Sequence, residues 1–305
     1  MPFFSEPAQN AMTTLSPSRM FAVLCAVSLV IGWQPLLRTF ALALHADEYT
    51  HLLLILPISA ALILTDRTVP KPALEPAVRL GSALLVISIL IGGYACWMAG
   101  SQSDVQLSAA MLAIVIWWIG SFVLCFGTCV AWQFLFPLCF LFWLVPIPAP
   151  ALNQIVAFWQ QGSATSASML FSALGIPVAQ NGIMLSIPGL TLEVAEECSS
   201  LRSSLMLIVT SMVLAHLFLR SFWRKTAIVL AAIPISIAKN GLRIFAIAML
   251  GTRVDPGFLH GNLHRRGGIL FFLLALFAVL LSIWLLNRTE NGYPRLQSPV
   301  KSQPA

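Results

Sequence analysis

The stretch VAEECSSLRSSLMLIV, residues 194–209, marks a sharp change from a polar segment to an apolar one. Its first ten positions hold two glutamates, one cysteine, three serines and one arginine. The apolar run continues to residue 219, which is close to the ~20 residues that a helix needs to cross a bilayer. The stretch therefore predicts the beginning of a transmembrane helix, with polar side chains gathered at the membrane surface.

The composition of the whole chain supports this interpretation. Of its 305 residues, 58% are hydrophobic and only 9% are charged, with a mean hydropathy of +0.87, whereas a soluble domain carries about 25% charged residues. We therefore expect an all-α integral membrane protein. The net charge of +6 comes from basic residues scattered near the ends of apolar runs, a pattern that sets topology and does not indicate nucleic-acid binding.

Eight apolar runs predict transmembrane helices, and the second of them is the shortest. They cover residues 20–37, 50–65, 82–100, 108–126, 128–147, 199–219, 226–250 and 267–286. We expect these runs to form one polytopic domain, residues 20–286. Polar tails at residues 1–19 and 287–305 are expected to be disordered.

The basic residues outside these runs predict the orientation of the chain. With the N-terminus in the cytoplasm, ten Lys and Arg residues fall on the cytoplasmic side and four on the outer side. Cytoplasmic loops carry the excess of Lys and Arg in membrane proteins. Both termini are therefore expected in the cytoplasm.

Residues 148–198 interrupt the apolar pattern and form an expected extracytoplasmic insert. Prolines in PIPAPALN end the fifth helix. The segment of mixed polarity that follows predicts a short helix at the outer interface, or one that re-enters the bilayer. The alternation in NGIMLSIPGLTLEV, around a Pro-Gly turn, predicts a β-hairpin, which leads directly into Cys198.

Ionisable residues near or inside the predicted membrane helices are candidates for function. Cys198 begins the sixth helix, where the positive end of the helix dipole favours a thiolate, and Arg202 lies four residues further on. Arg243 lies in the seventh helix, seven residues or roughly 10 Å from its expected outer end. Asn240 shares its face, and Lys239 is a second charge for which the sequence suggests no partner.

The loop between the seventh and eighth helices adds His260 and His264 on the same outer side. A cysteine, an arginine and a histidine are the groups that thiol-based acyl transfer uses: a thiolate attacks a carbonyl, an imidazole moves protons, and a guanidinium stabilises the oxyanion. Glu197, next to Cys198, either caps the sixth helix, orients Arg202 or tunes the thiol.

Three short blocks carry a resemblance to a known family. EECSSLRSS (196–204), NGLR (240–243) and HRRGG (264–268) resemble, in order, the signature blocks of exosortases and archaeosortases, which are membrane cysteine transpeptidases. Their pattern is Glu-x-Cys-Ser-Gly/Ser-x-Arg-Ser, then Asn-x-x-Arg, then His-x-x-x-Gly. DEYTH (47–51) and residues 174–194 are also similar to segments of this family, so the resemblance covers most of residues 45–286.

The resemblance implies a role for each matched position. Cys198 would be the nucleophile, Arg243 would stabilise the oxyanion or orient the substrate, and His264 would be the general acid and base. His260 ranks second because it does not occupy a motif position. Substrate contact or structural support is the expected role of the remaining candidates: Arg202, Asn240, Glu197, Tyr49 and His51.

The resemblance also implies a substrate class and a location. The substrates would be exported proteins that end in a short motif such as Pro-Glu-Pro, a transmembrane helix and a basic tail. An enzyme of the bacterial inner membrane would cleave at the motif on the outer side and pass the new C-terminus to an acceptor. No cofactor is implied.

Other functions remain open at this level. A transporter could use the intramembrane Arg243 and Lys239 to bind an anionic solute, and a non-catalytic scaffold would need none of these groups. His260 and His264 have helical metal-ligand spacing, but the sequence offers no clear third ligand, so no metal site is predicted.

Overall fold

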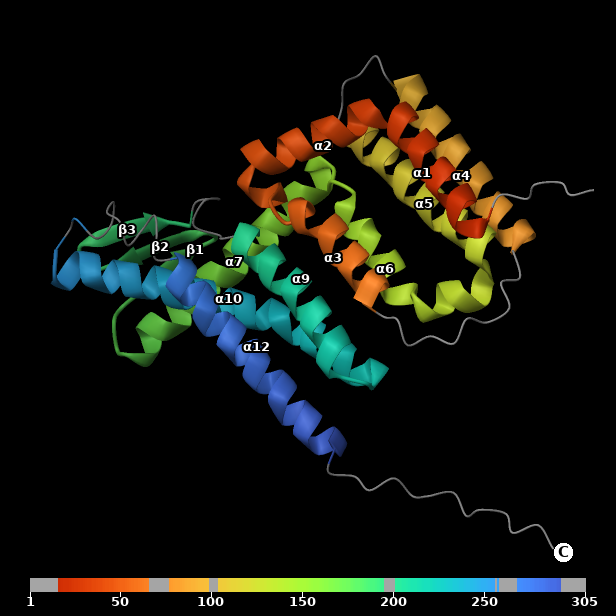
Figure 1. Cartoon of the computed structure of the whole chain (residues 1–305). Helices are drawn as coiled ribbons and strands as arrows, with labels where there is room; N and C mark the ends of the chain where they lie inside the picture. The colour runs from red at the N-terminus through yellow and green to blue at the C-terminus, as the bar shows by residue number, and fades with distance from the viewer. Residues whose placement is uncertain are drawn as a thin grey trace, which may run out of the picture. The chain divides into compact units, whose positions relative to one another are not determined.

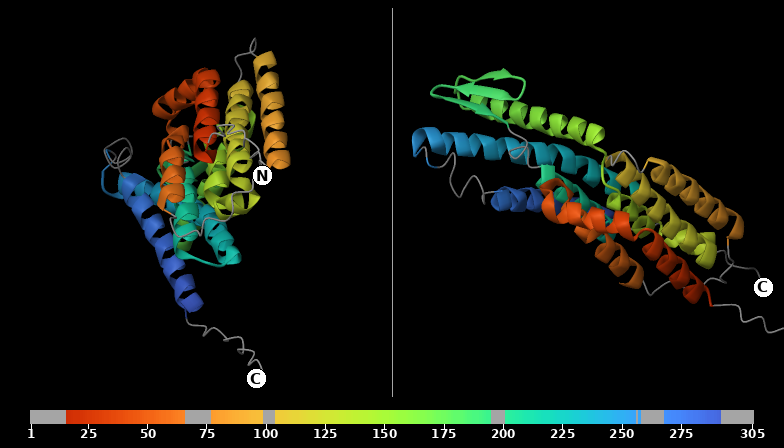
Figure 2. Two further views of the ribbon diagram at one scale, coloured as in Figure 1. Left: turned by 45° about the vertical axis from the view of Figure 1, so that its right-hand side comes forward. Right: turned by 90° about the horizontal axis from the view of Figure 1, so that it is seen from above.

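A computed structural model describes residues 16–65, 77–98, 104–194, 201–255, 257 and 268–291. Nearly all of the regular structure in these ranges is helical, with one small sheet (Figures 1 and 2). Six of the described helices are long and apolar enough to cross a membrane, and two bent helix pairs bring the number to eight. The chain is therefore a multi-pass helical membrane protein. Its contacts divide it into two compact units, Met1–Ala149 and Pro150–Ala305.

The first predicted helix is broken in the structure. α1 (Pro17–Ile31) and α2 (Trp33–His45) meet at Gly32 and are bent by 74°, so the prediction of one continuous helix over residues 20–37 was wrong. The cause lies at Pro35, which has no N–H to donate to the carbonyl of Ile31 and whose ring clashes with that carbonyl in a continuous helix.

The second and third predicted helices are confirmed. A short 3-10 turn, η1 (Asp47–Tyr49), leads into α3 (Leu52–Thr65), and together they form one candidate span. α4 (Val78–Trp97) is the next span and packs along α5 (Figure 1).

The fourth and fifth predicted helices meet where expected, but the fifth is not continuous. α5 (Asp104–Gln133) contains one non-helical residue, Gly127, with φ 84° and ψ 168°. The chain then continues as α6 (Leu135–Phe140) and the 3-10 helix η3 (Leu141–Leu144). Pro137 within α6 removes a donor from the helical ladder, which explains why residues 128–147 form short pieces.

The insert that follows contains a longer helix than predicted. α7 (Ala149–Ala173) has 25 residues, so the expectation of a short helix was wrong. The predicted hairpin is confirmed as β2 (Met184–Ile187) and β3 (Leu190–Glu193), joined through Gly189 at φ 83°. A third antiparallel strand, β1 (Ala179–Asn181), pairs with β2 and was not predicted.

The sheet is attached to the two neighbouring helices by one apolar cluster. Leu185 of the sheet packs with Phe171 of α7 and with Ala248, near the end of α10 (Phe222–Arg253). Because side chains alternate along a strand, Leu185 and Ile187 are buried while Met184 and Ser186 are exposed. The alternation that predicted the hairpin therefore marks its attachment face.

The last three helices form an antiparallel group. α9 (Leu201–Phe218) and α12 (Gly268–Asn291) both pack along α10 (Figure 1). Arg224 Nη1 donates to the carbonyl oxygen of Leu286 at 2.7 Å, which fixes the register of α10 against α12. α10 is longer than the predicted 226–250, so Arg243 lies ten residues, or about 15 Å, from its end rather than seven.

The break at Gly127 gives a test of the fold. A residue with a Cβ rarely adopts φ 84° and ψ 168°, so Gly127→Ala should lower the free energy of unfolding by about 1–3 kcal/mol. Thermal unfolding of the purified protein in detergent would measure this as a lower midpoint. Gly93→Ala is the matched control, because no atom lies within 4 Å of the added Cβ. Equal midpoints for the two variants would contradict the assignment of the break.

Candidate active site

The NGLR block holds α10 against α7 through its asparagine. Asn240 is 0% exposed, and its Nδ2 donates to Ser163 Oγ at 2.8 Å. Its Oδ1 has no hydrogen-bond partner in the part of the chain that the structure describes. A buried amide carbonyl without a partner is costly, so this oxygen is a polar group available inside the helix group.

The glycine of the same block permits the two helices to approach closely. A Cβ on Gly241 would overlap the side chain of Ser166 and lie 2.9 Å from the backbone nitrogen of Ala167. Only a residue without a Cβ fits this contact. The Asn-Gly pair therefore positions α10 on α7, and the arginine two residues later is held in place by that packing.

Lys239 has a partner that the sequence did not suggest. The side chain is only 5% exposed, and its Nζ donates to Ser203 Oγ in the first turn of α9. Ser203 belongs to the EECSSLRSS block and Lys239 directly precedes the NGLR block, so the contact brings the end of the first block close to the beginning of the second. It also shows that the beginning of α9 lies level with the middle of α10.

Arg243 follows one turn after Lys239 and is half-buried. A Cβ placed on Gly268, the first residue of α12, would lie 3.9 Å from Arg243 Nη1. Gly268 is the glycine of the His-x-x-x-Gly block. The last residues of the second and third blocks therefore lie close together, in agreement with the register set by Arg224 and Leu286.

The segment that precedes the cysteine is fixed at its last described residue. Gln160 of α7 is buried and donates through Nε2 to the carbonyl oxygen of Val194 at 3.1 Å, while the N–H of Val194 donates to Ile183 at 3.0 Å. Sequence reasoning missed this positioning role of Gln160. The sequence showed only a glutamine in the middle of a long segment of mixed polarity, and this does not indicate which group the side chain contacts.

Four of the predicted site residues lie outside the described residues: Glu197, Cys198, His260 and His264. In the sequence, Cys198 is three residues before Leu201, the start of α9, and His264 is four residues before Gly268, the start of α12. Among the described residues, no three His, Cys, Asp or Glu side chains are grouped as a metal ion would require.

Comparison with known families identifies the family of this chain. A sequence model described as transmembrane exosortase matches residues 41–281, which include all three blocks. The chain belongs to this family. No curated relative and no solved structure matches it.

Two further candidates of this exosortase have structural contacts within residues 1–149. The hydroxyl of Tyr49 donates to the carbonyl oxygen of Ile147 at 2.8 Å. His51 is buried, its Nδ1 lies 3.0 Å from the carbonyl oxygen of Glu48, and its ring meets Trp143 edge to face at 6.2 Å between centroids. These contacts hold the beginning of α3, and a structural role accounts for both side chains.

Arg202 differs from the other described candidates because its side chain is exposed. It is the second residue of α9 and precedes Ser203, the partner of Lys239. Since neighbouring residues of a helix point about 100° apart, Arg202 presents its charge on a different face of α9 from the Lys239 contact. That position suits contact with a substrate outside the helix group.

The close approach at Gly241 gives a second test. Gly241→Ala forces a Cβ into Ser166, and we expect it to cost about 1–3 kcal/mol of stability, as overpacking does. The double variant Gly241→Ala with Ser166→Gly should recover part of this loss, because only the backbone contact to Ala167 then remains. Thermal unfolding of the three proteins measures both effects. A single variant as stable as the parent would contradict the packing described for this block.

Proposed function

We propose that this exosortase is a cysteine transpeptidase of the bacterial inner membrane. It cleaves the C-terminal sorting signal of exported proteins through a thioacyl intermediate on Cys198 and transfers the new C-terminus to an acceptor. Arg243 and His264 complete the catalytic group. Both chain termini lie in the cytoplasm, and the chemistry takes place at the outer face.

The observation that carries this proposal is the meeting of Arg243 with Gly268. A Cβ placed on Gly268, the last residue of the His-x-x-x-Gly block, would lie 3.9 Å from Nη1 of Arg243, the last residue of the Asn-x-x-Arg block. The Lys239–Ser203 hydrogen bond brings the cysteine block to the neighbouring turn of α10. Chains of three and four residues reach at most about 11 and 14 Å, and these short sequence separations from Leu201 and Gly268 support the proposal that Cys198 and His264 act together with this arginine.

The proposed reaction uses one role per side chain. The Cys198 thiolate forms a bond to the scissile carbonyl carbon, and the resulting oxyanion accepts hydrogen bonds from the Arg243 guanidinium. The carbon–nitrogen bond then breaks, and His264 gives a proton to the leaving amine. In the second half, His264 takes a proton from the acceptor nucleophile, which attacks the thioester and releases the Cys198 sulfur.

The acidic recognition motif of such a substrate suits the basic groups that lie near the three blocks in the sequence. Exposed Arg202 is the second residue of α9, exposed Arg253 is the last residue of α10, and Arg265 and Arg266 follow His264 in the sequence. Opposite charges at a partly exposed surface favour encounter and orientation. We assign to these arginines the attraction of an acidic motif such as Pro-Glu-Pro.

A transporter of an anionic solute is the alternative that Lys239 and Arg243 suggest. A transport path needs polar groups at successive depths through the bilayer. Instead, Lys239 donates a hydrogen bond to Ser203, and Asn240 donates one to Ser163. These contacts use the polar groups to join helices, which favours a fixed catalytic site.

Replacement of the nucleophile separates the candidate functions. Cys198→Ala should abolish cleavage of an exported protein that carries the motif, the helix and the basic tail, while the enzyme remains in the membrane at its normal level. Immunoblots of substrate and enzyme measure both quantities. Cys129→Ala is the control, because this exposed cysteine of α5 lies outside the three blocks. Normal processing by Cys198→Ala would overturn the transpeptidase assignment.

Charge reversal tests the recognition of the acidic motif. The double variant Arg265→Glu with Arg266→Glu should reduce processing of a Pro-Glu-Pro substrate at least several-fold, since like charges now face each other. For a substrate in which the motif glutamate is replaced by glutamine, the same double variant should reduce processing less. Arg79→Glu, at the opposite end of its span in the expected topology, serves as the control. Equal processing of both substrates by parent and variant would contradict this role.

A further inference from the structure

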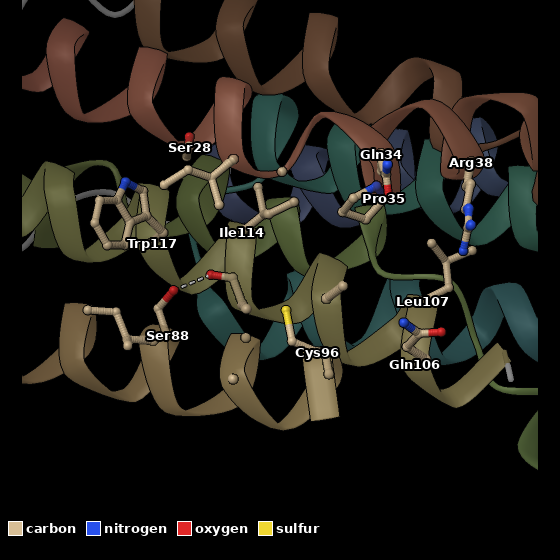
Figure 3. A pocket seen from close by; sticks show the side chains of 18 of the residues that line it. Ser28, Gln34, Pro35, Arg38, Ser88, Cys96, Gln106, Leu107, Ile114 and Trp117 are labelled. Carbon is tan, nitrogen blue, oxygen red and sulfur yellow. Dashed lines mark hydrogen bonds between the residues drawn. The ribbon is translucent and has the colours of Figure 1, made fainter. Parts of the chain in front are cut away.

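A cavity of about 700 Å³ lies within residues 1–149, among α1, α2, α4 and α5 (Figure 3). Its volume falls within the range of small-molecule sites, about 300–1,000 Å³. Among the described residues, its lining does not include Arg243, Asn240 or Lys239. The cavity therefore needs an explanation separate from the transpeptidase reaction.

One stripe of α5 forms the floor of the cavity. Its members recur at helical spacing and are mostly small or apolar: Gln106, Leu107, Ala110, Ala113, Ile114 and Trp117. The stripe from Gln106 to Trp117 rises about 16 Å at 1.5 Å per residue. One leaflet contributes about half of the ~30 Å hydrocarbon core, so the cavity is as deep as one leaflet.

The small residues facing this stripe keep the cavity open. Gly92 and Gly93 of α4 line it, and no atom lies within 4 Å of a Cβ placed on Gly93. Cys96, one turn further along α4, directs its sulfur into the same space (Figure 3). An extended apolar chain fits such a slot without displacing any side chain.

The deep end of the cavity offers no unsatisfied polar side chain. Trp117 Nε1 donates to the carbonyl oxygen of Leu24 at 2.9 Å, and Ser88 Oγ donates to that of Ala113 at 2.7 Å. Ser28 Oγ donates to the carbonyl oxygen of Cys25 and accepts from Trp118 Nε1. With these groups already hydrogen-bonded, the deep end suits hydrocarbon.

The other end of the cavity carries charge of both signs. Arg38 of α2 and Gln106 lie together at this end (Figure 3), and Asp104, the first residue of α5, also lines the cavity. Arg38 and Asp104 are exposed, and within the described ranges they form no ion pair with each other. A cation and an anion that are both open to a ligand fit a zwitterion.

We propose that this cavity binds one glycerophospholipid with a primary-ammonium headgroup. An acyl chain lies along the α5 stripe toward Trp117. The phosphate binds Arg38 and Gln106, aided by the positive N-terminal end of α5, and the ammonium group binds Asp104. Charge at both ends of the headgroup favours this lipid over one that is only anionic.

Lipid competition tests the headgroup assignment. The full-length protein is placed in nanodiscs containing phosphatidylethanolamine and phosphatidylglycerol in equal amounts, extracted mildly, and its retained lipid identified by mass spectrometry. The parent should retain phosphatidylethanolamine preferentially. Arg38→Gln should lower retention of both lipids by roughly tenfold, the size of a lost charged hydrogen bond, whereas Asp104→Asn should remove only the preference. Arg79→Gln, which is exposed and outside the cavity, should change neither.

Alkylation of cysteine tests the position of the acyl chain in the same protein. Added phosphatidylethanolamine should slow the reaction of Cys96 with N-ethylmaleimide, measured peptide by peptide, and leave Cys129 unchanged, because both are exposed but only Cys96 lines the cavity. Gly93→Leu should fill the space and abolish lipid retention without lowering the unfolding midpoint.

Three outcomes would overturn the proposal. One is equal retention of both lipids by the parent, which would indicate bulk lipid only. Another is equal protection of Cys96 and Cys129. The third is protection of Cys96 without any retained lipid, which would mean that a protein segment or a second copy fills the cavity.

Discussion

A lysine and an arginine one turn apart in an apolar helix are the constraint around which residues 150–305 are arranged. A basic residue at the centre of a membrane helix costs about 2.5–3.5 kcal/mol on insertion scales, so Lys239 and Arg243 require polar surroundings. Ser203 of α9 accepts a hydrogen bond from Lys239, and Arg243 lies against the first residue of α12. The helix that carries the charges therefore dictates where its neighbours begin.

The same constraint explains why α7 has mixed polarity. Its Ser163 and Ser166 face Asn240 and Gly241, where hydrogen bonding and close approach replace the hydrophobic effect, which does not drive helix association in lipid. Its Gln160 holds Val194, the last described residue before the cysteine block. One helix thus supports both the arginine block and the segment that leads to the proposed nucleophile.

The two compact units differ in the kind of site that they contain. Residues 150–305 use buried hydrogen bonds to fix a few polar side chains, as a catalytic site requires. Residues 1–149 contain an open, mostly apolar cavity with charge at one end, as an amphiphile requires. This division puts the proposed chemistry in one unit and the proposed lipid contact in the other.

Much of the architecture was predictable, because hydropathy and turn residues act locally. The lengths of the apolar runs predicted the membrane helices, and the alternation around Pro188 and Gly189 predicted the hairpin. The errors came from local backbone effects whose outcome depends on neighbours. Pro35 and Pro137 interrupt helices that the apolar runs predicted as continuous, and the short strand β1 pairs with the free edge of β2.

By itself, the sequence determined the membrane class, the order of the helices, the hairpin and the family signature, since each depends on residues close together in the chain. Only the tertiary structure decided which blocks meet. The pairing of Lys239 with Ser203, the fit of Gly241 against Ser166 and the approach of Arg243 to Gly268 join residues far apart in the chain. Such contacts follow from the register and closeness of packed helices, which no local pattern of residues specifies.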